Sequence, residues 1–187
     1  MGVDKPSQNP LVQRLQLLTM GWGYNFYNEK NRARADDLLV REKAAHFLGE
    51  AISALSPLES AYRLEFVPPA TRDNPFPPTE TVQRLKAITR MTEQIRDRAT
   101  LIRGASVPTQ DKIWFHIRDE RTLLYQLLAH DENLIQITHR IAETARALTP
   151  SGWDADSRTS AGMLAALLAE LDTILRERAA LLTLPTL

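Results

Sequence analysis

The longest regular pattern of hydrophobic and polar positions in this chain runs from Thr109 to Leu148. Alternating steps of four and three residues separate its recurring positions, which places them on one side of a helix. These positions are Ile113, Ile117, Glu120, Leu124, Leu127, Asp131, Leu134, Thr138, Ile141, Ala145 and Leu148. Pro150 disfavours further helix in the residue before it. The pattern predicts one long amphipathic helix that ends at Leu148.

Two acidic residues, Glu120 and Asp131, interrupt this mostly apolar stripe. Carboxylates inside a protein are usually paired with a positive group. Arg178 falls on the apolar side of the last predicted helix and is the natural partner. We therefore expect both acids to be structural, with Arg178 paired to one of them.

Helical spacing and helix-ending residues predict five further helices. A short one follows Asn9-Pro10, and a long one covers residues 29–55. Ser56-Pro57 with Glu59 has the form of a capping box, so we expect the chain to bend there into a short helix to Phe66. Long helices should also cover 79–103, ending at Gly104, and the region from Asp156 or Ser157 to Pro185. The short link before Thr109 favours residues 79–103 as an antiparallel neighbour of the longest helix.

The fold class that follows is all-α: a four-helix-type bundle with long helices, an N-terminal helical arm and a proline-rich connector. Residues 1–28 form the arm and an aromatic segment, and residues 29–187 form the bundle. The connector, residues 67–78, contains five prolines. At about 3.1 Å per residue, such a segment spans roughly 35 Å, enough to carry the chain back along the bundle as a surface strap. Within it, only Pro75 and Pro78 have the PxxP spacing of an SH3 ligand.

Composition narrows the class of protein. The 187 residues are 43% hydrophobic and 25% charged, with a net charge of zero and no cysteine. Disulfides, thiolate nucleophiles and cysteine-ligated metals are therefore excluded. No apolar run approaches the roughly 18 residues of a membrane span, and the N-terminus lacks the apolar core of a secretory signal. We expect a cytoplasmic protein that does not enter a membrane.

Aromatic residues concentrate between the first two helices. Trp22, Tyr24, Phe26 and Tyr27 place four aromatic side chains in six residues. Such a group either closes one end of a helical core or forms a docking platform, because Trp and Tyr dominate interface hot spots. We take the four residues as candidates for binding a protein partner.

The four histidines do not form a recognisable metal site. A carboxylate-bridged di-iron bundle needs Glu-x-x-His, and the residues three before each histidine are Lys43, Ile113, Leu127 and Gln136. His116 and His139 each precede a glutamate by four residues, which faintly resembles haemerythrin, but that family's other histidine spacings are missing. We predict no metal and no cofactor.

One pair of residues suggests a catalytic alternative. Arg41 and His46 match the Arg-x4-His spacing of the HEPN ribonucleases, which are also helical bundles. A helix turns about 100° per residue, so the two side chains diverge on a straight helix and would need a distorted helix or a second copy to converge. Glu42, His46 and Glu50, one turn apart, fit a solvated face equally well.

Charge is uneven along the chain. Residues 79–103 carry six basic residues against three acidic ones, and the last helix is acidic. The two helices can neutralise each other inside the fold. Alternatively, the basic helix contacts nucleic acid, and its candidate residues are Arg84, Arg90, Arg96 and Arg103.

The sequence favours a non-enzymatic helical interaction subunit or adaptor within a larger protein or nucleoprotein assembly. The aromatic segment and the broad apolar side of the C-terminal helix support a protein partner, or a homo-oligomer formed through that helix. The alternative is a nucleic-acid-binding or HEPN-like ribonuclease helical protein.

Overall fold

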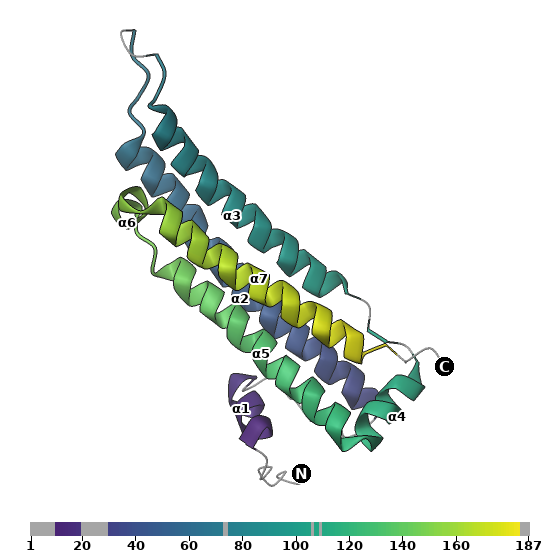
Figure 1. The fold of residues 1–187 in the computed structure, drawn as a ribbon. Coiled ribbons are helices and arrows are strands. Elements are labelled where there is room, and N and C mark those ends of the chain that lie inside the picture. The colour runs from purple at the N-terminus through teal and green to yellow at the C-terminus, as the bar shows by residue number, and fades with distance from the viewer. Residues whose placement is uncertain (1–9, 20–29, 73–74, 106, 109, 184–187) are drawn as a thin grey trace.

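The computed structural model describes residues 10–19, 30–72, 75–105, 107–108 and 110–183. These residues form seven helices and contain no β-strand, which confirms the all-α bundle (Figure 1). The helices are α1 (Pro10–Leu18), α2 (Lys30–Phe66), α3 (Thr79–Gly104), α4 (Asp111–Asp119), α5 (Arg121–Arg146), α6 (Pro150–Ala155) and α7 (Ser157–Leu181).

The four long helices form a ring with the order α2, α3, α7, α5. Helix α2 packs against α3 and α5, and α7 packs against the same two helices. The direction of the chain alternates from one long helix to the next, so α2 and α5 run parallel and α3 runs beside α7 (Figure 1). Among the described residues, α3 and α5 do not pack together. The prediction that they are antiparallel neighbours is therefore wrong, because the chain crosses the end of the bundle diagonally between them.

This diagonal crossing also explains why the predicted helix from Thr109 to Leu148 is two helices. Helix α4 covers the end of the bundle, and Glu120 takes extended backbone angles (φ −98°, ψ 100°) before α5 begins. Helix α4 packs against α2 and α5 and buries Ile113, Trp114 and Ile117. A straight helix would have carried these three side chains away from the bundle.

Helix α2 is also longer than predicted, because it continues through Pro57 to Phe66. The missing N–H of Pro57 removes a hydrogen bond to the Ser53 carbonyl group, four residues earlier. Ser53, Ser56 and Pro57 are all exposed, so water can satisfy that carbonyl. Tyr62, which follows the proline and is fully buried, anchors the last turns of α2 to the core. The expected bend at Ser56 is therefore wrong.

The proline-rich connector does not run back along the bundle. Helices α2 and α3 are neighbours, and the described part of residues 67–78 projects past their joined ends (Figure 1). It therefore links two adjacent helix ends, and the strap interpretation is wrong. The prediction for the helix that follows is confirmed, since α3 spans Thr79–Gly104.

Helix α6 was not predicted, although its capping signal is present in the sequence. The Thr149 hydroxyl accepts a hydrogen bond from the Gly152 N–H at 3.1 Å, and Pro150 occupies the first helical turn. At α7 the predicted cap is confirmed, because the Asp156 carboxylate accepts from the Thr159 N–H at 3.1 Å.

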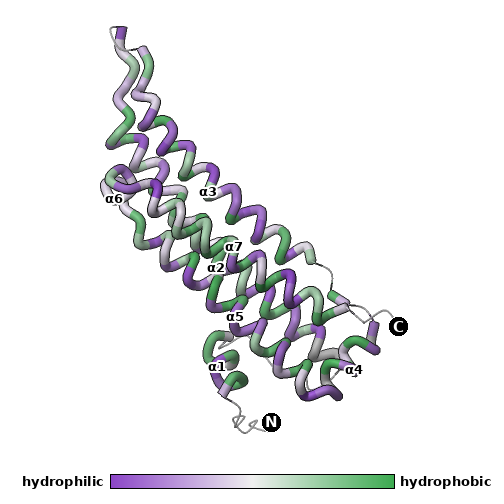
Figure 2. The backbone as a smooth tube through the Cα atoms, viewed as in Figure 1, coloured by the Kyte–Doolittle hydropathy of each residue, from purple (hydrophilic) through white to green (hydrophobic). Residues whose placement is uncertain are grey.

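The apolar residues of the long helices meet along the axis of the bundle, whereas α3 carries many hydrophilic residues along its length (Figure 2). Fully burying a leucine or isoleucine side chain stabilises a fold by about 1.5–3 kcal/mol. The core includes Leu48 and Leu55 of α2, Ile95 of α3, Leu134 of α5 and Leu171 of α7, none of which is accessible. All four long helices therefore contribute to a single core.

The N-terminal helix α1 packs on the outside of α5 (Figure 1). It buries Val12 and Leu15, and the Arg14 guanidinium reaches the Glu132 carboxylate at 3.3 Å. Glu132, itself buried, also accepts a hydrogen bond from Gln136 at 2.8 Å. The described part of the arm, α1, is thus attached to the bundle by apolar burial and by the ion pair of Arg14 with Glu132.

Candidate functional site

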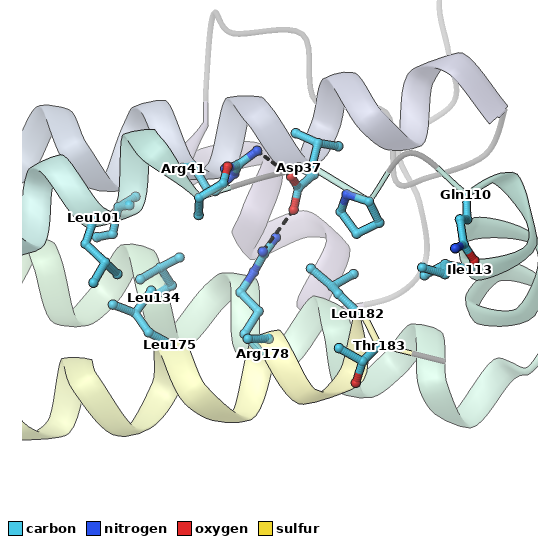
Figure 3. Close-up of a pocket in the computed structure, with 15 residues that line it drawn as sticks. Asp37, Arg41, Leu101, Gln110, Ile113, Leu134, Leu175, Arg178, Leu182 and Thr183 are labelled. Atoms are coloured by element: carbon cyan, nitrogen blue, oxygen red, sulfur yellow. Dashed lines mark hydrogen bonds and ion pairs between the residues drawn. The ribbon is translucent and has the colours of Figure 1, made fainter. Parts of the chain in front are cut away.

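A cavity of about 760 Å³ lies at the end of the bundle where α2 begins and α3 and α7 end. Most of its walls are apolar, and its charged residues come from α2 and α7 (Figure 3). The lining residues are Asp37, Arg41, Leu101, Ile102, Ala105, Val107, Pro108, Gln110, Ile113, Leu134, Leu175, Arg178, Ala179, Leu182 and Thr183. Apolar walls with a few convergent polar groups are typical of a binding site.

The crossing from α3 to α4 builds one wall of this cavity. The indole N–H of Trp114 donates to the Pro108 carbonyl group at 3.0 Å, and Trp114 is buried. This bond ties the link between α3 and α4 to the first turn of α4. Ile113, next to Trp114, then faces the cavity opposite the last turn of α7. The break at Glu120 therefore allows α4 to form one wall of the cavity.

A chain of buried charges forms the polar side of the cavity. The Asp37 carboxylate bridges two guanidinium groups, Arg41 Nη2 and Arg178 Nη1, each at 2.9 Å (Figure 3). Arg178 Nε also donates to Asp131 Oδ1 at 2.7 Å, and Arg41 Nη1 donates to the Ala105 carbonyl group at the end of α3. The chain thus connects α2, α5 and α7 to the C-terminus of α3. Its two arginines and two aspartates sum to zero charge.

The prediction that Arg178 pairs with one of the two acids is confirmed for Asp131, and the prediction that Glu120 is buried on the same stripe is wrong. Glu120 is exposed between α4 and α5, 3.6 Å from His116. The sequence pattern assigned it to a buried stripe only because it treated α4 and α5 as one straight helix. Asp37, which also interrupts the apolar side of its helix, completes the network, and the rule that buried acids are paired could have identified it.

Arg41 and His46, the catalytic alternative, lie in different surroundings. Arg41 is 5% exposed and engaged by Asp37 and the Ala105 carbonyl group. The His46 side chain is 51% exposed, and its Nε2 lies 3.5 Å from the Glu50 carboxylate. The structure therefore does not bring the two side chains into one site within this chain.

The four arginines proposed for nucleic acid also differ from one another. Arg84 is engaged by Asp154 and Glu80, with both N–O distances at 2.6 Å. Its hydrogen bond to Asp154 is the main reason why the pKa of the Arg84 guanidinium is raised above its ordinary value. Arg90, Arg96 and Arg103 are exposed on α3, along with the acidic Glu93 and Asp97.

One basic residue of α3 is neutralised by an acidic residue of α7. The Arg98 guanidinium binds the Asp172 carboxylate through two hydrogen bonds, at 3.3 and 2.9 Å. Hydrogen bonding to Asp172 raises the pKa of Arg98. On the described surface of α3, acidic residues thus lie among the basic ones. Two of the basic residues, Arg84 and Arg98, are paired with acids of the same chain.

The aromatic candidates Trp22, Tyr24, Phe26 and Tyr27 lie outside the described residues. Among the residues that the structure describes, no three acidic or histidine side chains gather in a way that could hold a metal ion. None of the described helices has both the length and the apolar character needed to cross a membrane.

A second polar cluster closes the opposite end of the bundle, where sequence reasoning identified only Arg84. Trp153 of α6 is fully buried, and its indole N–H donates to the Arg84 carbonyl group at 3.1 Å. The Tyr62 hydroxyl donates to Asp154 Oδ1 at 2.7 Å, and Arg84 Nη1 donates to the same oxygen at 2.6 Å.

The pKa of Tyr62 is raised to about 12, mainly by burial and in second place by the neighbouring Asp154 carboxylate. The hydrogen bonds from Tyr62 and then Arg84 lower the pKa of Asp154. Through these hydrogen bonds, the cluster holds α6 against α2 and α3.

Comparisons of this chain with known protein families, with curated proteins and with solved structures find no match.

Proposed function

We propose that this protein is a non-enzymatic helical interaction module, an adaptor that docks a partner protein in the cavity between α3, α4 and α7. The observation that carries the proposal is the combination of apolar walls with charged groups that already engage one another. Both oxygens of Asp37 lie against guanidinium groups, and Arg41 holds a backbone carbonyl. Such groups orient a bound segment and keep the cavity in shape, whereas a catalytic acid or base needs an accessible proton site.

The rim of the cavity supports a protein partner over a small molecule. Leu101, which lines the cavity, is 60% exposed. Ala179 and Gln110, also at the cavity, are exposed as well. Small-molecule sites usually bury roughly 70–90% of the ligand's surface. An amphipathic helix or an extended segment, by contrast, binds in an open apolar groove. An open rim of this kind suits a segment whose outer side stays in water or contacts the rest of its own protein.

The test uses two neighbouring alanines of α7. Ala179 lines the cavity, whereas its neighbour Ala180 is also exposed but does not line it. Ala179→Trp should fill the cavity and remove the partner from an affinity capture out of native lysate. Ala180→Trp should retain it, because a large side chain there points elsewhere. Both variants should keep the far-UV circular dichroism of the wild type.

Further arms of the same capture separate the alternatives. Capture that survives nuclease and falls only in Ala179→Trp supports the adaptor. Capture that disappears with nuclease, falls with salt and is lost when Arg96 and Arg103 are both changed to Glu would instead favour nucleic-acid binding. Ribonuclease activity of the purified protein that Arg41→Ala with His46→Ala removes would favour the enzyme. Trp22→Ala and Tyr24→Ala variants that stay folded but lose the partner would move the docking site to the aromatic segment.

A further inference from the structure

We propose that the connector between α2 and α3 carries a second docking element, at the end of the bundle opposite the cavity: residues 75–78, with Phe76, are a ligand for an aromatic-lined groove that binds polyproline II segments on a partner protein. This inference does not depend on the cavity. It rests on the exposure, the backbone conformation and the position of these four residues.

Exposure is the first observation. The Phe76 side chain is 79% exposed, and Leu64 on the last turns of α2 is 87% exposed. Isolated exposed apolar residues are common and need no explanation by themselves. Phe76 differs because Pro75 precedes it and Pro77 follows it, so that residues 75–78 form an uncharged apolar run, of which only Pro77 is partly covered.

The backbone of this run is already restricted to the conformation that such grooves bind. Pro78 has φ −54° and ψ 133°, close to the ideal polyproline II values of about −75° and +145°. Each residue before a proline is pushed toward the same region, and this applies to both Phe76 and Pro77. Segments that are extended before binding lose little conformational entropy on docking, and SH3, WW and EVH1 domains exploit this property. Pro75 and Pro78 also have the PxxP spacing.

The third observation is the position of the run. The connector projects beyond the ends of α2 and α3, so a partner domain can approach it without contacting the rest of the bundle (Figure 1). The base of the projection is held in place by aromatic stacking of Phe66 on Tyr62, with ring centroids 5.0 Å apart, and by the ion pair of Arg84 with Asp154. Residues 75–78, which lead directly into α3 at Thr79, are therefore displayed next to a fixed base. Together with the cavity, they would give the adaptor a docking site at each end.

The experiment uses the full-length protein against a panel of purified SH3, WW and EVH1 domains, with affinity measured by fluorescence polarisation. The variants are Phe76→Ala and the double change Pro75→Ala with Pro78→Ala. Phe115→Ala is the matched control, because Phe115 is a partly exposed phenylalanine on α4, at the other end of the bundle. All variants should melt within a few degrees of the wild type, since each replaced side chain is largely outside the core.

We expect at least one domain of the panel to bind the wild type and Phe115→Ala equally. Its affinity should fall by about tenfold or more both in Phe76→Ala and in the double proline variant, because a single aromatic anchor often dominates such an interface. Ala179→Trp should leave this affinity unchanged, which separates residues 75–78 from the cavity. The proposal is overturned if no domain of the panel binds, or if Phe76→Ala binds as well as the wild type. It is also overturned if the only effect of Phe76→Ala is weaker co-sedimentation of the protein with phosphatidylcholine vesicles.

Discussion

At the scale of single residues, Arg178 links helices that are not neighbours in the ring. Helices α2 and α7 lie diagonally across the ring, yet the Arg178 guanidinium contacts Asp37 on α2 and Asp131 on α5. Removing two charges from water is costly, and a buried pair often stabilises no more than apolar residues of the same size would. The network therefore contributes to which helices face one another more than to overall stability.

Removing one member of the network should nevertheless destabilise the fold strongly. Arg178→Ala would leave two buried carboxylates, Asp37 and Asp131, with Arg41 as the remaining arginine of the chain of charges. We expect a loss of about 3–5 kcal/mol in the free energy of unfolding, measured by urea denaturation. Arg176→Ala is the control, because Arg176 is exposed on the same helix and should change stability by about 0.5 kcal/mol or less. Equal and small effects from both variants would contradict the role assigned to Arg178.

At the scale of elements, the short helices α4 and α6 close the two ends of the ring. Helix α4 covers one end through Ile113, Trp114 and Ile117, and α6 closes the other through Trp153. Each is too short to be stable alone, since isolated helices below about 12–15 residues are marginal in water. Their helical state therefore depends on the tryptophan that each one buries and on the backbone carbonyl that its indole N–H reaches.

Trp153 should consequently account for much of the docking of α6. Trp153→Ala is expected to lower the free energy of unfolding by about 3–5 kcal/mol, through lost burial and the cavity left behind. Trp153→Phe retains most of the apolar volume but removes the hydrogen bond from the indole N–H to the Arg84 carbonyl group, which should cost about 0.5–1.5 kcal/mol. Urea denaturation of both variants measures the difference. An alanine variant as stable as the phenylalanine variant would mean that α6 is not fastened in this way.

At the scale of the whole molecule, the cluster of Tyr62, Asp154 and Arg84 makes stability depend on pH at both extremes. The pKa of Tyr62 rises from its ordinary value of 10.0 to about 12, so the folded protein keeps a proton that the unfolded chain loses. Stability from this group is complete below pH 10 and decreases as the pH rises toward 12. The pKa of Asp154 is lowered from 3.8, so its contribution is present above that value and decreases as the pH falls through the lower folded-state pKa.

Two variants isolate these contributions. Thermal melts between pH 9 and 11.5 should show a smaller decrease in Tm for Tyr62→Phe than for the wild type, because phenylalanine has no proton to lose. Between pH 5 and 2.5, Asp154→Asn should show a smaller decrease than the wild type for the corresponding reason. Parallel pH profiles for wild type and variants would show that the folded-state pKa values do not differ from those of the unfolded chain.

The sequence by itself determined the local structure of most of the chain. Apolar spacing located the long helices, and Gly104 and Asp156 marked the end of α3 and the start of α7. That Arg178 pairs with Glu120 or Asp131 was also predicted from the sequence, because a charge on an apolar stripe requires a partner, and the structure shows that the partner is Asp131. These signals are local, or depend only on the rule that buried charges are compensated.

Only the tertiary structure decided which helices are neighbours and where a helical pattern is interrupted. The same spacing of apolar residues fits one straight helix or two helices joined at Glu120, and the choice depends on the diagonal crossing from α3 to α5. Helix α2 continues through Pro57 for two reasons. The hydrogen bond that Pro57 removes lies on the exposed side of the helix, and Tyr62, after the proline, is buried in the core. The cavity depends on the break at Glu120 and on the packing of the ring, because its walls come from residues between 37 and 183 that approach one another only when the ring closes.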